Sequence, residues 1–303
     1  MADDWTSKRE QTNLYWLTLL WWTTRILGRT VTRACIISMV TLVYFCRDRS
    51  ARHASRVFLH RINGVPPSLW LIFKHFYTFA TVTLDRTFIL SGMLDKFNVS
   101  VHGEEHFENL DQGAIVVTAH YGCFEIARVL GQRTRGLTID ILLDKQHNPD
   151  TMRFLRHLNP AMADRIVDAA TPGPQLVLKL AHLLDENHLV GIMADRVMTG
   201  QRTIEHTFLG ADARFPYGPW AMAIILKRPV IFCFGTFNGG NRYTITCERL
   251  DPGSLEGTTQ QRAEQAVTHY VSALERHVRQ YPLNWFNFYD FWSTADPADT
   301  TER

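Results

Sequence analysis

The position of one histidine, at the end of an apolar segment, suggests chemistry. Residues 114–125 read AIVVTAHYGCFE, so His120 follows a run typical of a buried β-strand, and Glu125 lies five positions further on. On one continuous helix the two side chains would point about 140° apart. They can meet only if His120 lies on a loop that folds back over the first turn of a following helix. Gly122 permits the tight turn that this arrangement requires.

A histidine held by a carboxylate can act as a general base. Glu125 would accept a hydrogen bond from one imidazole nitrogen, which leaves the other nitrogen ready to take a proton. This arrangement activates hydroxyl groups in many enzymes. The alternative is a chance placement, because the chain has 13 histidines and a glutamate is favoured near a helix N-terminus. We predict that His120 and Glu125 are catalytic residues.

Strands and helices must alternate to place His120 at such a turn, and the sequence beyond residue 97 predicts that they do. An α/β fold follows, with a largely parallel central sheet flanked by helices. Ligands of such sheets gather beyond the carboxyl ends of strands, where His120 is expected. Strands are expected within residues 98–103, 114–118, 137–144, 188–195, 228–238 and 241–250, and helices within 68–97, 123–132, 150–159, 173–187, 218–227 and 259–280.

The N-terminal part of the chain has a different character. Residues 11–24 and 34–46 carry no charge, and each run is shorter than the ~20 residues that span a bilayer. Five arginines between Arg47 and Arg61 follow the second run. We predict that residues 1–61 form amphipathic or hydrophobic membrane-anchoring helices and that residues 62–303 form the catalytic domain. The arginines would then face the cytoplasm. The alternative is a buried helix pair in a soluble protein.

Composition argues against several other classes of protein. The formal net charge is +2, so no strong attraction to nucleic acid is implied. The five cysteines include no CxxC pair, which disfavours a disulfide framework or a zinc ribbon. His102 and His106 have helical ligand spacing, but Gly103 stands where a zinc protease needs a glutamate, and no metal is predicted. The chain also lacks GxSxG, which disfavours a lipase-like serine.

The block from His120 to Glu125 resembles the H-x4-D/E block of glycerolipid acyltransferases. The resemblance is closest to the lipid A late acyltransferase branch, also called the lauroyl/myristoyl acyltransferase branch. Three further segments resemble that branch in the same order, and together they extend the resemblance over roughly residues 14–292. They are VGIMADR, TFLGADARFPYGPWAMAIILKRPVIFCF and RQYPLNWFNFYDFW.

The resemblance implies roles for individual residues. His120 would be the general base, Glu125 its orienting partner, and Asp195 and Arg196 would lie near the donor or acceptor headgroup. The alternative for Asp195 and Arg196 is a structural ion pair at the end of a strand. Lys145 stands about where the branch has an arginine. Pro216 and Gly218 precede a helix and could present backbone N–H groups to an oxyanion or a phosphate, or could form a plain turn. The aromatic residues near the C-terminus either line an acyl channel or complete the core: Trp285, Phe286, Phe288, Tyr289, Phe291 and Trp292.

The expected function is therefore that of a membrane-associated O-acyltransferase. It would move a fatty acyl chain from acyl carrier protein or acyl-CoA to a hydroxyl of a lipid or glycolipid, at the cytoplasmic face of the bacterial inner membrane. Neither a metal nor a cofactor is required, because a thiol is a good leaving group. The alternatives are a thioesterase or lysophospholipase that uses water, and a non-catalytic lipid-binding protein. Cys123 is a less favoured nucleophile, because transfer between two thioesters gains little driving force.

Overall fold

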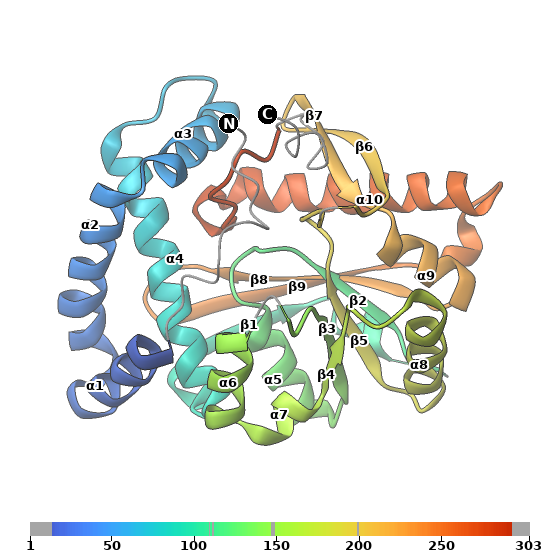
Figure 1. Ribbon diagram of the computed structural model, residues 1–303, viewed down its shortest axis with the longest axis horizontal. Helices are drawn as coiled ribbons and strands as arrows, with labels where there is room; N and C mark the ends of the chain where they lie inside the picture. Colours follow the sequence, from blue (N-terminus) through green and yellow to red (C-terminus); the bar gives the residue numbers. More distant parts are fainter. Residues whose placement is uncertain (1–13, 109, 111, 147–148, 199, 293–303) are drawn as a thin grey trace.

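The computed structural model describes residues 14–292 except 109, 111, 147–148 and 199, and it places a seven-stranded sheet at the centre (Figure 1). The strand order is β1-β9-β8-β2-β5-β3-β4, in which only the β8–β9 pair is antiparallel. The predicted fold class is therefore confirmed. The strands are β1 (Asn98–His102), β2 (Ile115–Thr118), β3 (Ile139–Leu143), β4 (Ile166–Asp168), β5 (Leu189–Met193), β8 (Val230–Phe237) and β9 (Arg242–Leu250).

Strand β2 lies in the middle of the sheet and is buried on both faces, as its unbroken apolar sequence predicts. Ile115 and Val117 belong to the same hydrophobic cluster as the buried face of α10 (Thr259–Gln280), whereas Val116 packs with α5 (Phe124–Arg135). These helices lie on opposite sides of the sheet (Figure 1). The remaining helices beside the sheet are α6 (Pro149–Leu158), α7 (Pro160–Asp164), α8 (Gly173–Asp185) and α9 (Gly218–Leu226).

The N-terminal part forms a layer of helices beside the sheet. Helix α1 (Leu14–Thr32) bends at Gly28, where φ is 76°, and continues through η2 (Arg33–Ile37) into α2 (Ser38–Arg47). Helix α3 (Arg49–Asn63) begins where the Asp48 side chain accepts a hydrogen bond from the Ala51 amide. Helix α4 (Leu69–Leu90) then runs back beside α2 (Figure 1). The division into an anchor and a catalytic domain at residue 61 stays a prediction.

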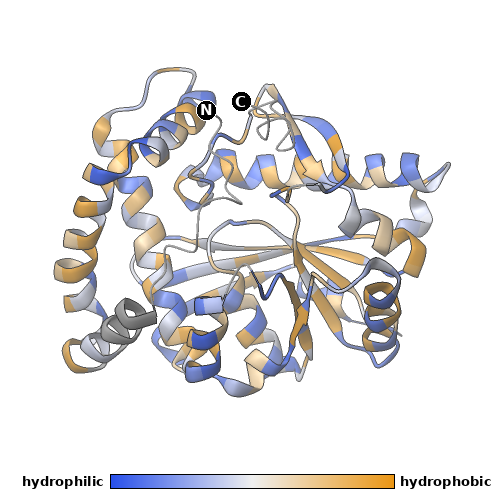
Figure 2. Cartoon of the chain, viewed as in Figure 1, coloured by the Kyte–Doolittle hydropathy of each residue, from blue (hydrophilic) through white to orange (hydrophobic). Residues whose placement is uncertain are grey.

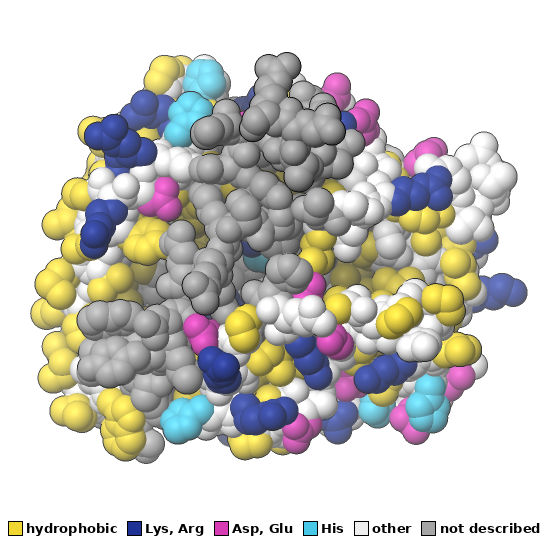
Figure 3. Space-filling view, in the orientation of Figure 1, with side chains coloured by type: hydrophobic (Ala, Val, Ile, Leu, Met, Phe, Trp, Pro, Cys, Tyr) yellow, Lys and Arg dark blue, Asp and Glu magenta, His cyan; other side chains and the backbone are white. Residues whose placement is uncertain are grey.

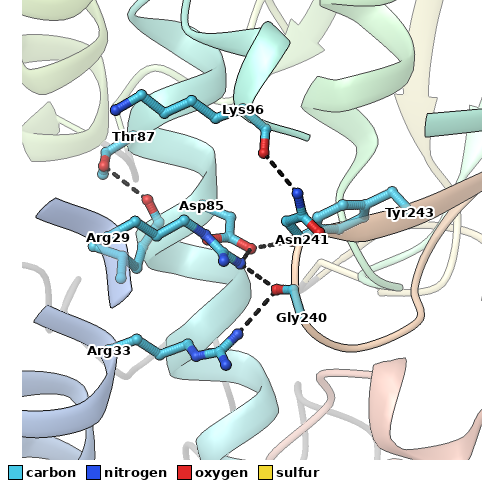
Figure 4. Close-up of polar contacts among 9 residues, drawn as sticks. Arg29, Arg33, Asp85, Thr87, Lys96, Gly240, Asn241 and Tyr243 are labelled. Carbon is cyan, nitrogen blue, oxygen red and sulfur yellow. Dashed lines mark hydrogen bonds and ion pairs between the residues drawn. The ribbon is translucent and has the colours of Figure 1, made fainter. Parts of the chain in front are cut away.

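A buried ion pair fastens the N-terminal helices to the sheet (Figure 4). Nε and Nη2 of Arg29 lie 2.6 and 2.7 Å from the two oxygens of Asp85, a fully buried residue of α4. The Tyr243 hydroxyl donates to the same carboxylate at 2.8 Å, and both Arg29 and Arg33 donate to the carbonyl oxygen of Gly240. Removal of one member of such a pair costs about 3–5 kcal/mol, because the remaining charge stays buried.

Some elements differ from those that the sequence predicts. Residues 203–216, for which no strand is predicted, form a hairpin of β6 (Thr203–Phe208) and β7 (Ala211–Pro216). Strand β4 and helix α7 have only three and five residues, too few to show periodicity. Helix α4 ends at Leu90 rather than continuing to residue 97. The predicted boundaries of the helix at 259–280 are confirmed by α10.

The loop after β2 depends on a glycine that approaches another strand closely. Gly122 has φ 53°, and a Cβ added there would lie 1.9 Å from the carbonyl oxygen of Gly235. Gly136 has a similar φ of 66°, but a Cβ there would have no atom within 4 Å. We predict that Gly122→Ala lowers the free energy of unfolding by at least about 2 kcal/mol more than Gly136→Ala does.

Chemical denaturation of the two variants tests this prediction. Both substitutions place alanine at a positive φ, so the backbone strain is common to both and their difference isolates the contact with Gly235. Equal destabilisation would contradict the close packing of this loop against β8.

Candidate active site

Two neighbouring strands bring His120 and Asp195 together. His120 follows β2 and Asp195 follows β5, which pairs with β2 in parallel, so both residues lie at the carboxyl ends of their strands. Nδ1 of His120 lies 2.8 Å from Oδ1 of Asp195, and the His120 backbone amide donates to Oδ2 at 3.0 Å. The carboxylate therefore fixes both the position and the orientation of the histidine.

Asp195 is fully buried, and four donors surround its carboxylate. Besides the two groups of His120, Trp285 Nε1 donates to Oδ2 at 3.2 Å and Asn287 Nδ2 donates to Oδ2 at 2.9 Å. Burial by itself would raise the pKa of Asp195, but its interactions with His120 and the charge of Arg196 outweigh burial and lower the pKa to about 2. Asp195 is therefore ionised at neutral pH and acts only as an acceptor.

The ionised partner determines the tautomer of His120. Because Asp195 can only accept, Nδ1 carries the proton and Nε2 is the nitrogen with an available lone pair. Burial and the charge of Arg196 lower the pKa of His120, with Arg86 contributing in the same direction, although Asp195 opposes them. The imidazole is thus neutral at neutral pH. Its side chain is 29% exposed, so a ligand can reach it.

Glu125 occupies a different place from the one expected. It forms an ion pair with Arg86 of α4, and its Oε2 accepts from Cys123 Sγ at 3.7 Å. Among the described residues, its hydrogen bonds do not include His120, so the expected Glu125–His120 hydrogen bond is wrong, and Asp195 is the partner of the imidazole instead. The reason is that Asp195 on the neighbouring strand reaches Nδ1 directly, whereas Glu125 in the first turn of α5 faces α4. The catalytic roles of His120 and Glu125 stay predictions.

Arg196 is held firmly beside the His120–Asp195 pair. Its Nε donates to Asn287 Oδ1 at 2.7 Å, and its Nη2 donates to the Phe286 carbonyl oxygen at 2.9 Å. The guanidinium carbon lies 5.6 Å from the centre of the Tyr289 ring. Asn287 therefore bridges Arg196 and Asp195, one with each end of its amide.

The other predicted substrate-binding residues belong to elements after β3 and around α9. Lys145 follows β3, the strand beyond β5, and its backbone amide donates to Asp168 Oδ1 at 3.3 Å. Pro216 ends β7 and Gly218 begins α9. In the part of the chain that the structure describes, the hydrogen bonds of Lys145, Pro216 and Gly218 do not connect them to His120. Their substrate contacts stay predictions.

Cys123 is poorly placed to be a nucleophile. It is fully buried, and burial, together with the charge of Glu125, raises the pKa of its thiol well above the usual range. A thiolate, not a thiol, attacks carbonyl groups. These observations favour a packing role, in keeping with the sequence-based preference against this residue.

Three backbone amides of the loop that carries His120 are already engaged. The amide of Gly122 donates to the Asn284 carbonyl at 2.7 Å, and the amide of Cys123 donates to the Gly235 carbonyl at 2.8 Å. The His120 amide is bound by Asp195. These three amides are therefore not available to an oxyanion.

The C-terminal aromatic residues pack in the core next to His120 rather than forming an open channel. Trp285 is fully buried, and Phe286 and Phe291 are buried as well, so the interpretation as core is favoured. The Phe286 amide donates to the His120 carbonyl at 2.7 Å. The Trp285 carbonyl accepts from Nε2 of the buried His75, which lies in α4 and accepts through Nδ1 from Ser55 of α3.

Sequence reasoning missed three residues of the site: Arg86, Trp285 as a donor to Asp195, and Asn287. A polar residue inside the aromatic run NWFNFYDFW is a signal of a buried hydrogen bond, and it points to Asn287. Arg86 lies in a helix with few charges, where a cation is unusual, but the sequence does not reveal its partner. Within the described residues, no group of three or more His, Cys, Asp or Glu side chains is arranged to hold a metal ion.

Comparison with protein families matches residues 3–294 to the family described as "Bacterial lipid A biosynthesis acyltransferase". Among solved structures, the chain is similar to the 1-acyl-sn-glycerophosphate (LPA) acyltransferase PlsC from Thermotoga maritima, with 13% identity and a TM-score of 0.37. That alignment covers 86% of this chain and 97% of PlsC. None of the curated proteins compared with the chain matches it. The assignment rests on the family match, which spans nearly the whole chain.

Proposed function

Because the chain belongs to the bacterial lipid A biosynthesis acyltransferase family and is an acyltransferase, we propose that it moves a fatty acyl group from a thioester to a hydroxyl of a lipid or glycolipid. The donor is acyl carrier protein or acyl-CoA. The observation that supports this proposal most is the hydrogen bond from His120 Nδ1 to the buried carboxylate of Asp195. It gives His120 the tautomer that a general base needs.

In the proposed reaction, Nε2 of His120 takes the proton of the acceptor hydroxyl as its oxygen attacks the thioester carbonyl. The imidazolium that forms is stabilised by the ionised Asp195. The tetrahedral intermediate then collapses, its C–S bond breaks, and the departing thiolate receives the proton from the imidazolium. The products are an ester and a thiol, and His120 returns to its neutral form.

We further propose that this protein works at a membrane surface. The described chain has one helix that is apolar and long enough to cross a bilayer, the 22-residue stretch Ile26–Arg47, and only 17% of its most apolar window is buried in the protein. Figure 2 shows that α2 is predominantly hydrophobic, and Figure 3 shows apolar side chains along the same side of the molecule. The exposed apolar residues here are Ile26, Leu27, Val31, Met39, Val40, Leu42, Val43 and Tyr44.

The contacts of this apolar stretch favour a helix that lies in one leaflet rather than one that crosses the bilayer. Its first part is fixed to Asp85 by Arg29, and α2 packs along α4. The loop before α4 and the first turn of α4 add exposed Val65, Leu69 and Trp70 to the apolar surface. With the arginines of α3 beside it, this surface suits the cytoplasmic face of the inner membrane, where anionic headgroups and a lipid acceptor are found.

The roles of the His120–Asp195 pair and of Glu125 are tested by three substitutions, each assayed with a labelled acyl thioester and a lipid acceptor. His120→Ala should lower turnover by about 10²–10⁴-fold, because general-base catalysis is lost. Asp195→Asn should cost at least about 10²-fold, because the imidazolium loses its stabilising charge. Glu125→Gln should cost less, because the Glu125 hydrogen bonds in the described chain go to Arg86 and Cys123 rather than to His120.

A second histidine–aspartate pair provides the control. His188 Nδ1 lies 2.7 Å from Asp140 Oδ2, but this pair is at the amino end of β5, on the opposite edge of the sheet. His188→Ala should therefore leave turnover near the wild-type value. Wild-type turnover in His120→Ala would overturn the mechanism. Release of free fatty acid by the wild type would indicate a thioesterase, and the absence of both products would indicate a lipid-binding protein.

Membrane association is tested by sedimentation with vesicles that contain anionic lipid. Binding of the wild type should persist in about 1 M salt, because salt screens exposed charges but does not weaken apolar burial. The double substitution Met39→Asp and Val43→Asp should lower partitioning by at least about tenfold, since it removes two exposed apolar contacts.

Leu178 is the matched control, because it is 72% exposed and belongs to α8, which lies on the other side of the molecule from α2 (Figure 1). Leu178→Asp should partition like the wild type. Full release of the wild type by salt alone would show that charge, not insertion, holds the protein on the membrane.

A further inference from the structure

Arg86 is a cationic residue at the site that no family block accounts for. It lies in α4, outside the four sequence segments that resemble known acyltransferases, and its side chain is 39% exposed. Glu125, 15% exposed, holds it through an ion pair from the first turn of α5. The pair is therefore partly exposed, and its glutamate lies five residues along the chain from His120.

The charge of Arg86 acts on His120. Arg86 and Arg196 both lower the pKa of His120, so both guanidinium groups are close enough to the imidazole for their charges to be felt. His120 is itself partly exposed. The geometry agrees, because Glu125 in the first turn of α5 joins Arg86 to the loop that carries His120, and all three side chains are partly exposed.

Arg196 and Arg86 differ in how their guanidinium groups are hydrogen-bonded within the protein. Arg196 uses Nε and Nη2 for Asn287 and Phe286, which fixes it within the protein. Among the described residues, Arg86 has hydrogen bonds only to Glu125, through Nη2. A guanidinium carries five N–H donors, so Arg86 keeps most of them for a ligand. The two Glu125 oxygens are engaged by Arg86 and Cys123.

The same face of α4 also carries an exposed aromatic residue. Phe79 precedes Arg86 by seven positions, which places it on the same side of the helix about 10 Å away. It is 41% exposed, and its ring lies 5.3 Å from that of Phe286, whose amide binds the His120 carbonyl. This face therefore offers an apolar contact and a cation, which suits a molecule with an apolar part and an anionic group.

We propose that Arg86, positioned by Glu125, binds a phosphate group of a substrate next to His120. The planar guanidinium matches the geometry of phosphate oxygens and can bind two of them at once. This proposal rests on the proposed acyl transfer, which supplies two sources of phosphate: the phosphopantetheine of the donor and a phosphorylated headgroup of the acceptor.

Steady-state kinetics of Arg86→Gln with each substrate varied in turn is the test. The KM for the substrate that carries the phosphate should rise at least about tenfold, because a charged hydrogen bond is lost. Arg86→Lys should recover part of the affinity, since it keeps the charge but not the two-point contact. Arg133→Gln removes an exposed arginine of α5 that pairs with Asp95, and should change neither KM.

The results also distinguish the source of the phosphate. A rise in the acceptor KM supports the proposal and assigns the phosphate to the acceptor, and a rise in the donor KM supports it and assigns the phosphate to the donor. Unchanged KM values would overturn it, whether turnover is kept, as for a purely structural ion pair, or falls, as for a group that stabilises the oxyanion.

A binding measurement separates this proposal from the proposed function. Inorganic phosphate should raise the thermal unfolding midpoint of the wild type and of Arg133→Gln, but not that of Arg86→Gln, because a ligand that binds the folded state stabilises it. If the wild type shows this effect without acyl transfer, the phosphate site stands and the proposed function fails. If phosphate stabilises Arg86→Gln as much as the wild type, the site is overturned.

Discussion

The ionised carboxylate of Asp195 is the constraint on which the rest of the structure depends. A fully buried charge costs several kcal/mol unless donors surround it, and here four donors come from two distant segments of the chain. His120 is brought by the β2–β5 pairing, whereas Trp285 and Asn287 belong to a segment that returns after α10. His120 acquires its tautomer only when these two segments have come together, so the stability of the fold and the proposed chemistry depend on the same hydrogen bonds.

The segment after α10 needs support of its own, and the N-terminal helices provide it. His75 of α4 donates to the Trp285 carbonyl and accepts from Ser55 of α3, so both helices hold the residues that surround Asp195. Arg29 in turn ties α1 to α4 and to the β8–β9 turn. The apolar helix surface is thus connected to the site through buried polar contacts. This connection suits an enzyme whose acceptor is a lipid, because it fixes how the site is oriented relative to the surface.

Local pattern was sufficient to predict much of the fold. The unbroken apolar run of β2 and the helical periodicity of α10 both appear where the sequence places them. The loop at His120 followed from the positions of a strand, a glycine and a helix. The partner of His120 did not follow, because Asp195 lies 75 residues away and reaches it only through strand pairing. Glu125 was near in sequence, but the direction of its side chain depends on Arg86, a residue from another helix. The choice between two carboxylates is therefore a tertiary property.

The central claim is that Asp195, and not Glu125, sets the protonation of His120. The pH dependence of kcat/KM tests it most directly, because its acid limb reports the pKa of the base in the free enzyme. The wild-type limb should lie below pH 6.5, since burial and Arg196 lower the pKa of His120. Asp195 raises that pKa, so the limb should move to lower pH in Asp195→Asn and stay in place in Glu125→Gln. If the acid limb of kcat/KM moved to lower pH in Glu125→Gln but not in Asp195→Asn, Glu125 rather than Asp195 would set the protonation of His120, and the central claim would be wrong.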